Sequence, residues 1–139
     1  MIILDTNVIS ELMRPMPATQ VVRWIDKQPA AGLFTTSISE AEISYGIELL
    51  PRGKRREGLL AAAEAMFIDD FAGRVLGFDS NAARAFAAIA ARRRALGKPI
   101  SHPGAQIAAL TRLHGAALAT RNVADFDGCD IPLIDPWVG

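Results

Sequence analysis

The sequence predicts an α/β fold, a three-layer sandwich in which helices flank a mostly parallel central sheet. Short apolar or β-branched runs alternate along the chain with longer segments of helical periodicity. No two predicted strands are joined by a two-residue hairpin turn, so the connections must cross over the sheet, as parallel strands require. With 139 residues, the chain is expected to form a single domain over residues 1–139, since domains usually have roughly 100–200 residues.

The first half of the chain is predicted to contain two strands and four helices. Residues 1–4 are a continuous apolar run that ends at Asp5, as in a buried strand. Residues 33–37 carry β-branched and aromatic side chains and form the second strand. Ser39 and Glu42 have the S-x-x-E spacing of a capping box, which predicts a helix that begins at Ser39. The predicted helices cover residues 8–13, 19–27, 39–50 and 54–70.

In the second half of the chain, predicted strands and helices continue to alternate. Ser80 is predicted to cap a long alanine-rich helix, which ends at Gly97-Lys98-Pro99. The next helix begins near His102, because Pro103 is tolerated in a first turn. The predicted elements are strand 74–78, helix 80–96, helix 102–114, strand 116–120, loop 122–128 and strand 131–134.

The composition describes an electrically neutral chain. Lys plus Arg and Asp plus Glu both number 15, which excludes a generally basic nucleic-acid coat protein but not an enzyme with local charge. The one cysteine, Cys129, cannot form an intramolecular disulfide, which fits a reducing cytosol. No apolar run reaches about 18 residues, and Asp5 interrupts the apolar start. We therefore expect a cytoplasmic protein without a membrane span or signal peptide.

Polar side chains gather where the predicted strands end. Asp5 follows the first strand, and Arg121-Asn122 and then Asp125 follow the strand at 116–120. Glu42, in the helix after the second strand, and the start of the helix at His102 should face the same edge. Ligands of open parallel sheets bind at this edge, so these residues are candidates for a functional site.

Carboxylates gathered in this way favour a hard metal ion. A cluster of acids with few nearby cations is costly unless a metal neutralises it. Oxygen ligands suit Mg²⁺ or Mn²⁺. A water activated by such an ion can attack a phosphodiester, a chemistry that needs neither histidine nor cysteine.

Each candidate also has a purely structural interpretation. Asp5 can cap a helix, Glu42 can complete the capping box with Ser39, Asn122 can cap a turn, and Asp125 can be a solvated loop charge. The clusters Arg92-Arg93-Arg94 and Arg52–Arg56 are most simply solvated faces, although they are the best local patches for a phosphate backbone. The aromatic residues expected in the core are Trp24, Phe67, Phe86 and Phe126.

Three segments together resemble the PIN-domain ribonucleases, and among them the VapC toxins of bacterial toxin–antitoxin pairs. They are residues 1–11 with Asp5-Thr6-Asn7, residues 37–47 with Glu42, and residues 118–126 with Thr120-Arg121-Asn122 and Asp125. The similarity extends over essentially the whole chain, including the final Asp-Pro-Trp137. The three segments in this order, in a chain of this length, are a specific signature.

The resemblance implies an Mg²⁺- or Mn²⁺-dependent endoribonuclease toxin that acts on structured RNA such as tRNA or ribosomal RNA. It implies a VapB-like antitoxin partner, through which alone operator DNA is contacted, and a homodimer or a toxin–antitoxin hetero-oligomer. The apolar groove for the antitoxin is expected among the early helices, around Trp24, Ile25, Ile47, Leu49 and Leu50.

The resemblance also assigns site residues. Asp5 and Glu42 match the first two acidic ligands, and Asn122 stands where many relatives have aspartate, with Asp125 able to support its charge. The remaining acid of the family falls at Gly104, which offers no ligand. Two explanations stay open, an inactivating Asp→Gly change or a natural variant with weak or altered metal binding. In either case the chain is expected to be impaired as a nuclease.

Two other functions compete with this interpretation. A haloacid-dehalogenase-like phosphatase also places an aspartate after its first strand, but it needs a second aspartate where this chain has Asn7. A non-catalytic PIN-like module that binds an antitoxin or takes part in regulation is the other alternative, and Gly104 is the feature that raises it.

Overall fold

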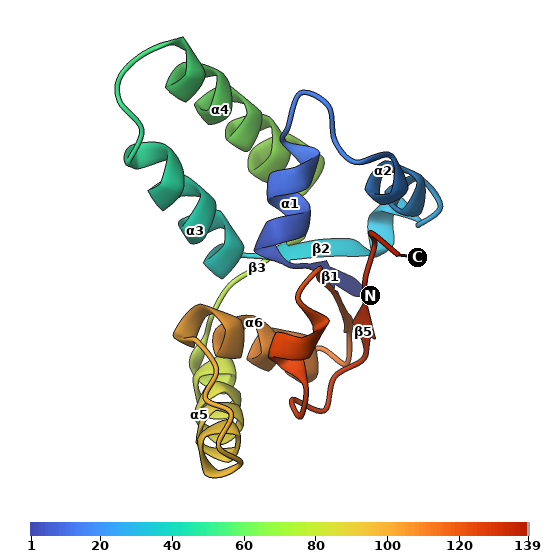
Figure 1. Ribbon diagram of the computed structural model, residues 1–139, viewed down its shortest axis with the longest axis vertical. Coiled ribbons are helices and arrows are strands. Elements are labelled where there is room, and N and C mark those ends of the chain that lie inside the picture. The colour runs from blue at the N-terminus through green and yellow to red at the C-terminus, as the bar shows by residue number, and fades with distance from the viewer. Residues whose placement is uncertain (139) are drawn as a thin grey trace.

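A computed structural model describes residues 1–138 of the chain. Within these residues, five short strands form one parallel sheet (Figure 1). The order across the sheet is β3-β2-β1-β4-β5, and every neighbouring pair is parallel. The predicted α/β class is confirmed. The strands are β1 (Ile2–Leu4), β2 (Leu33–Thr36), β3 (Val75–Leu76), β4 (Ala117–Ala119) and β5 (Leu133–Ile134).

Helices cover both faces of this sheet, which makes the three layers that the sequence predicts. In Figure 1, α1 to α4 lie on one side of the strands, and α5 and α6 lie on the other. Short helical turns η1 (Ala30–Gly32), η2 (Ala65–Asp70) and η3 (Val123–Phe126) complete the connections. The α-helices are α1 (Thr6–Leu12), α2 (Thr19–Asp26), α3 (Ser37–Glu48), α4 (Lys54–Glu64), α5 (Ser80–Ala95) and α6 (His102–Leu113).

Two hydrophobic cores lie on the two faces of the sheet. Successive residues of a strand point to opposite faces. Leu4 and Ala119 therefore join the core under α1 to α4, whereas Ile3 and Leu118 join the core under α5 and α6. The aromatic residues expected in the core are all in these clusters, as buried or partly buried members.

The predicted capping residues are wrong for two helices. Thr36, not Ser39, caps α3, and its Oγ1 accepts a hydrogen bond from the Ser39 N–H at 3.1 Å. Asp79, not Ser80, caps α5 by accepting from the Ala82 N–H at 2.9 Å. In both places a suitable acceptor stands one to three residues earlier, where it reaches the free N–H groups of the first turn.

Other differences concern element lengths. The predicted helix 54–70 changes pitch at Ala65 and ends in the π-helical turn η2. The predicted strands 74–78 and 131–134 each shrink to two residues, because only those residues pair with a neighbouring strand. Among the described residues, no helix combines the length and apolar character needed to cross a bilayer.

Candidate functional site

The carboxyl edge of the sheet opens into a cleft of about 830 Å³. It is bounded by the end of β1, the first half of α3, the start of α6 and the segment after β4. The structure brings all of the positions singled out in the sequence to this cleft: Asp5, Glu42, Gly104, Asn122 and Asp125.

Asp5 is the most buried of these residues, with 6% of its surface exposed. It caps α1, because its Oδ1 accepts from the Thr6 N–H at 2.8 Å. Its Oδ2 accepts from Thr120 Oγ1 at 2.7 Å. Burial raises the pKa of Asp5 above its ordinary value, the hydrogen bonds from Thr120 and Thr6 oppose this, and the charges of Glu42 and Asp125 raise the pKa further. The fold therefore holds a carboxylate where its charge is poorly solvated.

Glu42 reaches the cleft from α3. Its Oε1 accepts from Thr6 Oγ1 at 2.8 Å, which links α3 to the first turn of α1. The suggested capping box with Ser39 is wrong, since Ser39 lies in the first turn and its N–H bonds to Thr36. Glu42 is therefore not used as a helix cap and is held beside Asp5 by Thr6.

Asn122 and Asp125 lie on one short turn. The Asn122 N–H donates to Thr120 Oγ1 at 3.1 Å, so the hydroxyl that bonds Asp5 also holds the start of this turn. The Asp125 N–H donates to the Asn122 carbonyl at 3.0 Å, closing η3. Both side chains are exposed at the cleft. Thr120 is thus the residue that joins Asp5 to the Asn122 turn.

Gly104 is the third residue of α6. Ser101 caps this helix, and its Oγ accepts from the Gly104 N–H at 3.1 Å. A Cβ on Gly104 would lie 2.9 Å from Ser101 Oγ and 3.2 Å from Ile100 Cγ1. Both neighbours are side chains that can yield by rotation, so an aspartate fits here after a small shift of the cap. Its charge would stand in a first helical turn, where the helix dipole favours an anion.

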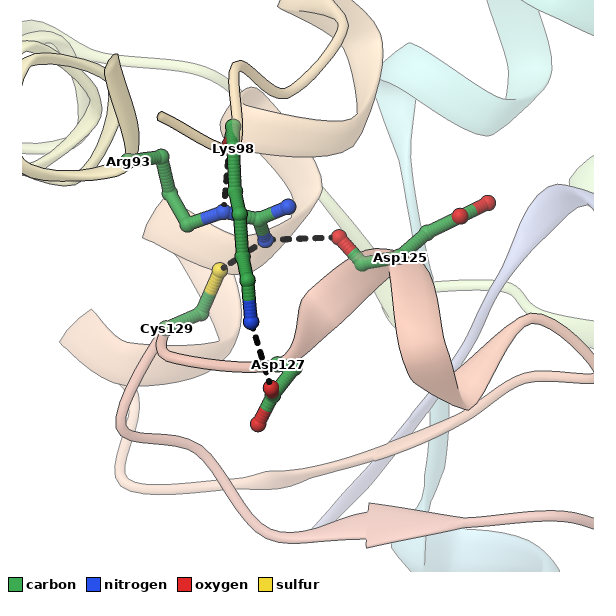
Figure 2. Close-up of polar contacts among 5 residues, drawn as sticks. All are labelled: Arg93, Lys98, Asp125, Asp127 and Cys129. Carbon is green, nitrogen blue, oxygen red and sulfur yellow. Dashed lines mark hydrogen bonds and ion pairs between the residues drawn. The ribbon is translucent and has the colours of Figure 1, made fainter. Parts of the chain in front are cut away.

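Arg93 is a site residue that the sequence interpretation missed. Although Arg92 and Arg94 are exposed, only 5% of Arg93 is exposed, so the solvated-face interpretation of the arginine cluster is wrong for Arg93. Its Nε donates to the Lys98 carbonyl and its Nη1 to the Asp125 carbonyl, both at 2.7 Å. Figure 2 shows the guanidinium between these two carbonyls, with the Asp125 carboxylate directed away from it.

We call the two hydrogen bonds from Arg93 to the Lys98 and Asp125 carbonyls the Arg93 clamp. Two further contacts lie beside this clamp. Nη1 also lies 3.5 Å from Cys129 Sγ, and Lys98 forms an exposed ion pair with Asp127 at 3.5 Å (Figure 2). Arg93 thus fixes the turn that carries Asp125 against the connection that leads into α6. The sequence pattern of the helix did not indicate this role for Arg93, because nothing in the sequence distinguishes it from the arginines on either side.

A basic and aromatic group completes the lining of the cleft. Arg14 and Arg121 both line it, and so does Trp137, which follows β5. Arg14 is paired with Glu11 at 3.2 Å, whereas the Arg121 guanidinium lies over the Trp137 ring, 5.0 Å from its centroid. Arg121 was expected at this edge beside Asn122, whereas Arg14 and Trp137 lay outside the predicted site, since single cations and a terminal tryptophan are common on any surface.

The oxygen atoms that line the cleft are of the kind that a hard cation prefers as ligands. Too few of the side chains that carry them stand close together, however, to form a metal site. Among residues 1–138, no three Asp, Glu, His or Cys side chains stand close enough together to hold a metal ion. The donors present are the carboxylates of Asp5, Glu42 and Asp125 and the amide of Asn122, the oxygen ligands that Mg²⁺ and Mn²⁺ prefer. The poorly solvated charge of Asp5, repelled by two acids, is what a cation would neutralise.

Comparisons with known proteins agree with this geometry. Residues 2–127 match the PIN domain. The chain is 39% identical to the VapC ribonuclease Y4jK of Sinorhizobium fredii, covering 99% of this chain and 98% of that protein. It is 37% identical to Toxin FitB of Neisseria gonorrhoeae over 99% of each chain. A solved structure of FitAB bound to an IR36 DNA fragment is similar with a TM-score of 0.91 at 37% identity, covering 99% of this chain and 96% of that one.

Proposed function

Since the chain belongs to the PIN-domain family, we propose that it is the toxin of a toxin–antitoxin pair and acts as an endoribonuclease dependent on Mg²⁺ or Mn²⁺. The observation that carries this proposal is the convergence of Asp5, Glu42, Asn122 and Asp125, from three separate segments of the chain, on one cleft. The phosphatase alternative does not fit this family. Structured RNA, such as tRNA or ribosomal RNA in the cytoplasm, is the proposed substrate.

The residues of the cleft have distinct roles in this proposal. Asp5 and Glu42 would hold the ion, with Asn122 and Asp125 beside them. When bound, the ion would supply Lewis-acid activation of the scissile phosphodiester and of the attacking water. Thr120 and Thr6 orient the two carboxylates through their 2.7 and 2.8 Å hydrogen bonds. Arg121, which is exposed at the same cleft, would attract the phosphates that flank the cleaved bond.

We further propose that Gly104 leaves this chain impaired as a nuclease. The position faces the cleft in the first turn of α6, and it supplies no oxygen. Without a carboxylate there, the ion would be held by fewer charged ligands, which weakens its binding. The same observation favours the second candidate function, a non-catalytic module that binds its antitoxin.

A second hollow is the proposed binding site of a VapB-like antitoxin, and the similarity to a FitAB complex supports the existence of such a partner. It has a volume of about 770 Å³, and most of its lining residues belong to α1, α3 and α4. Figure 1 shows these three helices on the same side of the sheet. Ile47 and Leu50, two of the expected groove residues, line it. Trp24 and Ile25 instead pack against the core, and Leu49 is exposed outside the lining.

The proposed assembly is the one that the family resemblance implies, and the similarity to a DNA-bound FitAB complex supports its contact with DNA. The full chain, residues 1–139, would act as one domain, alone as a homodimer or with antitoxin as a hetero-oligomer. The antitoxin would make the contact to operator DNA.

The Gly104→Asp variant tests the proposed function. We expect metal binding by calorimetry and RNA cleavage to increase by orders of magnitude, because a carboxylate ligand is added. Gly104→Asn is the matched control, since it makes the same steric demand on Ser101 without the charge, and chelation of the metal should abolish the gain.

The outcomes separate the candidate functions. Equal activity of the original chain and Gly104→Asp would show that the chain is not impaired. Antitoxin binding without cleavage by either form would overturn the nuclease and support the non-catalytic module.

A further inference from the structure

The cleft changes in character along the edge of the sheet. Asp5 follows β1, and Glu42 lies on α3, which follows β2. On the other side of β1, the segment after β4 brings Arg121 into the cleft next to Asn122 and Asp125, and Trp137 enters it after β5. A volume of about 830 Å³ is that of a pocket for an organic molecule, and it exceeds what one phosphodiester group fills. The β4–β5 end of the cleft therefore has room for another part of a ligand.

At this end the Arg121 guanidinium lies over the Trp137 ring, and we call these two residues the Arg121–Trp137 shelf. The guanidinium carbon lies 5.0 Å from the centroid of the indole ring. Trp137 is half-buried and packs against the core under α1 to α4, whereas Arg121 is exposed. The ring thus supports the guanidinium from the protein side, and the guanidinium presents its other side to solvent.

Hydrogen bonds from main-chain N–H groups to side-chain oxygens hold both residues of the shelf in place. The Arg121 N–H donates to Asn7 Oδ1 at 3.2 Å, which ties the end of β4 to α1. The Trp137 N–H donates to Asp135 Oδ1 at 2.9 Å, and Pro136 between them is buried. Because the backbone of the shelf is already ordered, a ligand would lose little affinity to ordering it.

We infer that the Arg121–Trp137 shelf binds an unpaired nucleobase of the RNA whose phosphate would lie at the ion held by Asp5 and Glu42. Unpaired bases stack on arginine planes and aromatic rings, and such stacking tolerates many sequences because every base has a π-face. A cation alone would suffice to attract a phosphate, but an aromatic ring beneath the cation is the arrangement that stacks a base. The inference rests on the proposed function, since it names where part of the same substrate binds.

The two tryptophans of the chain allow a direct test. Trp24 lies on α2 and is not part of the cleft lining, so the Trp24→Phe variant leaves Trp137 as the only indole fluorophore. This full-length variant is titrated, without divalent ions, with a single-stranded oligoadenylate of about eight nucleotides. An oligomer of the same length that has ribose and phosphate but no bases is titrated in parallel.

We expect a saturable change of Trp137 fluorescence with the oligoadenylate and a much smaller change with the abasic oligomer, which offers Arg121 phosphate but no base. Arg121→Ala in the same background should weaken binding about tenfold, as loss of a base-stacking partner does. Arg84→Ala, which removes an exposed arginine of α5, is the matched control and should bind as the parent does.

The inference is overturned if oligoadenylate binding, followed by anisotropy of a labelled oligomer, leaves the Trp137 fluorescence unchanged, or if no binding occurs. An equal response to the abasic oligomer would also overturn it, since Arg121 would then contact phosphate alone. These outcomes are independent of catalysis. Failure of Gly104→Asp to cleave RNA would instead count against the proposed nuclease.

Discussion

Asp5 shows how one side chain serves both the fold and the site. Its Oδ1 caps α1 through the Thr6 N–H, and its Oδ2 is held by Thr120 Oγ1. Helix capping and metal binding, which stand as alternatives in the sequence, are therefore compatible in the structure. The buried charge works against folding, because burial raises the pKa of Asp5. Such a cost is typical of residues that are kept for function.

Glu11 is the opposite case, a buried acid that stabilises the fold. Its Oε2 accepts from the Ala18 N–H at 2.8 Å, and Arg14 pairs with it at 3.2 Å. The hydrogen bond from Ala18 is the main reason that the pKa of Glu11 is lowered from its ordinary value of 4.5, and Arg14 lowers it further while burial opposes the change. The carboxylate thereby fixes the segment between α1 and α2.

The stabilisation by Glu11 should depend on pH. Because the pKa is lower in the folded than in the unfolded state, the contribution is fully present above about pH 4.5 and disappears as the pH falls through the lowered value. Glu11→Gln should therefore cost about 1 kcal/mol at pH 7 and progressively less in acid, as measured by urea unfolding. Glu64→Gln, at an exposed position on α4, should cost little at either pH. A cost for Glu11→Gln that stays constant down to pH 3 would contradict the prediction.

At the scale of single side chains, the sequence predicts some of the residues of the cleft but not all of them. Asp5, Glu42, Asn122 and Asp125 were identifiable because each follows a predicted strand, and the structure brings them together. Arg93 was not identifiable, because burial distinguishes it from Arg92 and Arg94 only when the packing of α5 is known.

At the scale of elements, the end of α5 is joined to the site by one connected set of hydrogen bonds. Gly97 adopts φ +73°, its N–H donates to the Arg94 carbonyl at 3.0 Å, and the Lys98 N–H donates to the Arg93 carbonyl at 2.9 Å. This is the Schellman pattern that ends a helix, and glycine suits its left-handed position. The same turn presents the Lys98 carbonyl to the Arg93 side chain.

Removing the Arg93 clamp should loosen η3. Arg93→Met leaves the carbonyls of Lys98 and Asp125 without these donors, so we expect the free energy of unfolding to fall by about 1–3 kcal/mol. Amide hydrogen exchange in residues 123–126 should also accelerate. Arg92→Met is the control, because it breaks an exposed ion pair with Asp130, worth at most about 1 kcal/mol. If both variants lose the same stability, Arg93 is not the clamp.

The elements were largely predictable, whereas their exact starts were not. The alternation of apolar runs and helical segments gave the strands and helices in the right order. The starts of α3 and α5 were misplaced because Thr36 and Asp79 compete for the same free N–H groups as the serines that follow them. Only the backbone path decides between two such acceptors.

At the scale of the whole molecule, the net charge is zero, so only a few local cations can attract RNA. Of the arginines at the cleft, Arg14 is exposed but paired with Glu11, Arg93 is buried, and Arg121 is exposed over the Trp137 ring. The parallel direction of the strands could be anticipated from the crossover connections, but the composition of the cleft depends on the strand order, in which β4 joins β1 and β5 joins β4.

The affinity for RNA should therefore depend only weakly on salt. Each phosphate contact to a single strand contributes a slope of about −0.7 in a plot of log affinity against log salt, so one to three contacts predict a slope of about −1 to −2. Fluorescence anisotropy without divalent ions should show a loss of about four- to sixteenfold between about 50 and 200 mM salt. Arg121→Ala should make the slope shallower by about 0.7. A slope of about −4 or steeper would point to a broad basic surface instead.

The parallel pairing of β1 with β4 has a consequence for the synthesis of the protein. Asp5 and Glu42 leave the ribosome early, but the strand that brings Thr120 and Asn122 beside them is translated near the end of the chain. An incomplete nascent chain therefore has no assembled cleft and cannot cut the messenger RNA from which it is being read. If the protein is the nuclease that we propose, its activity begins only after the chain is released from the ribosome.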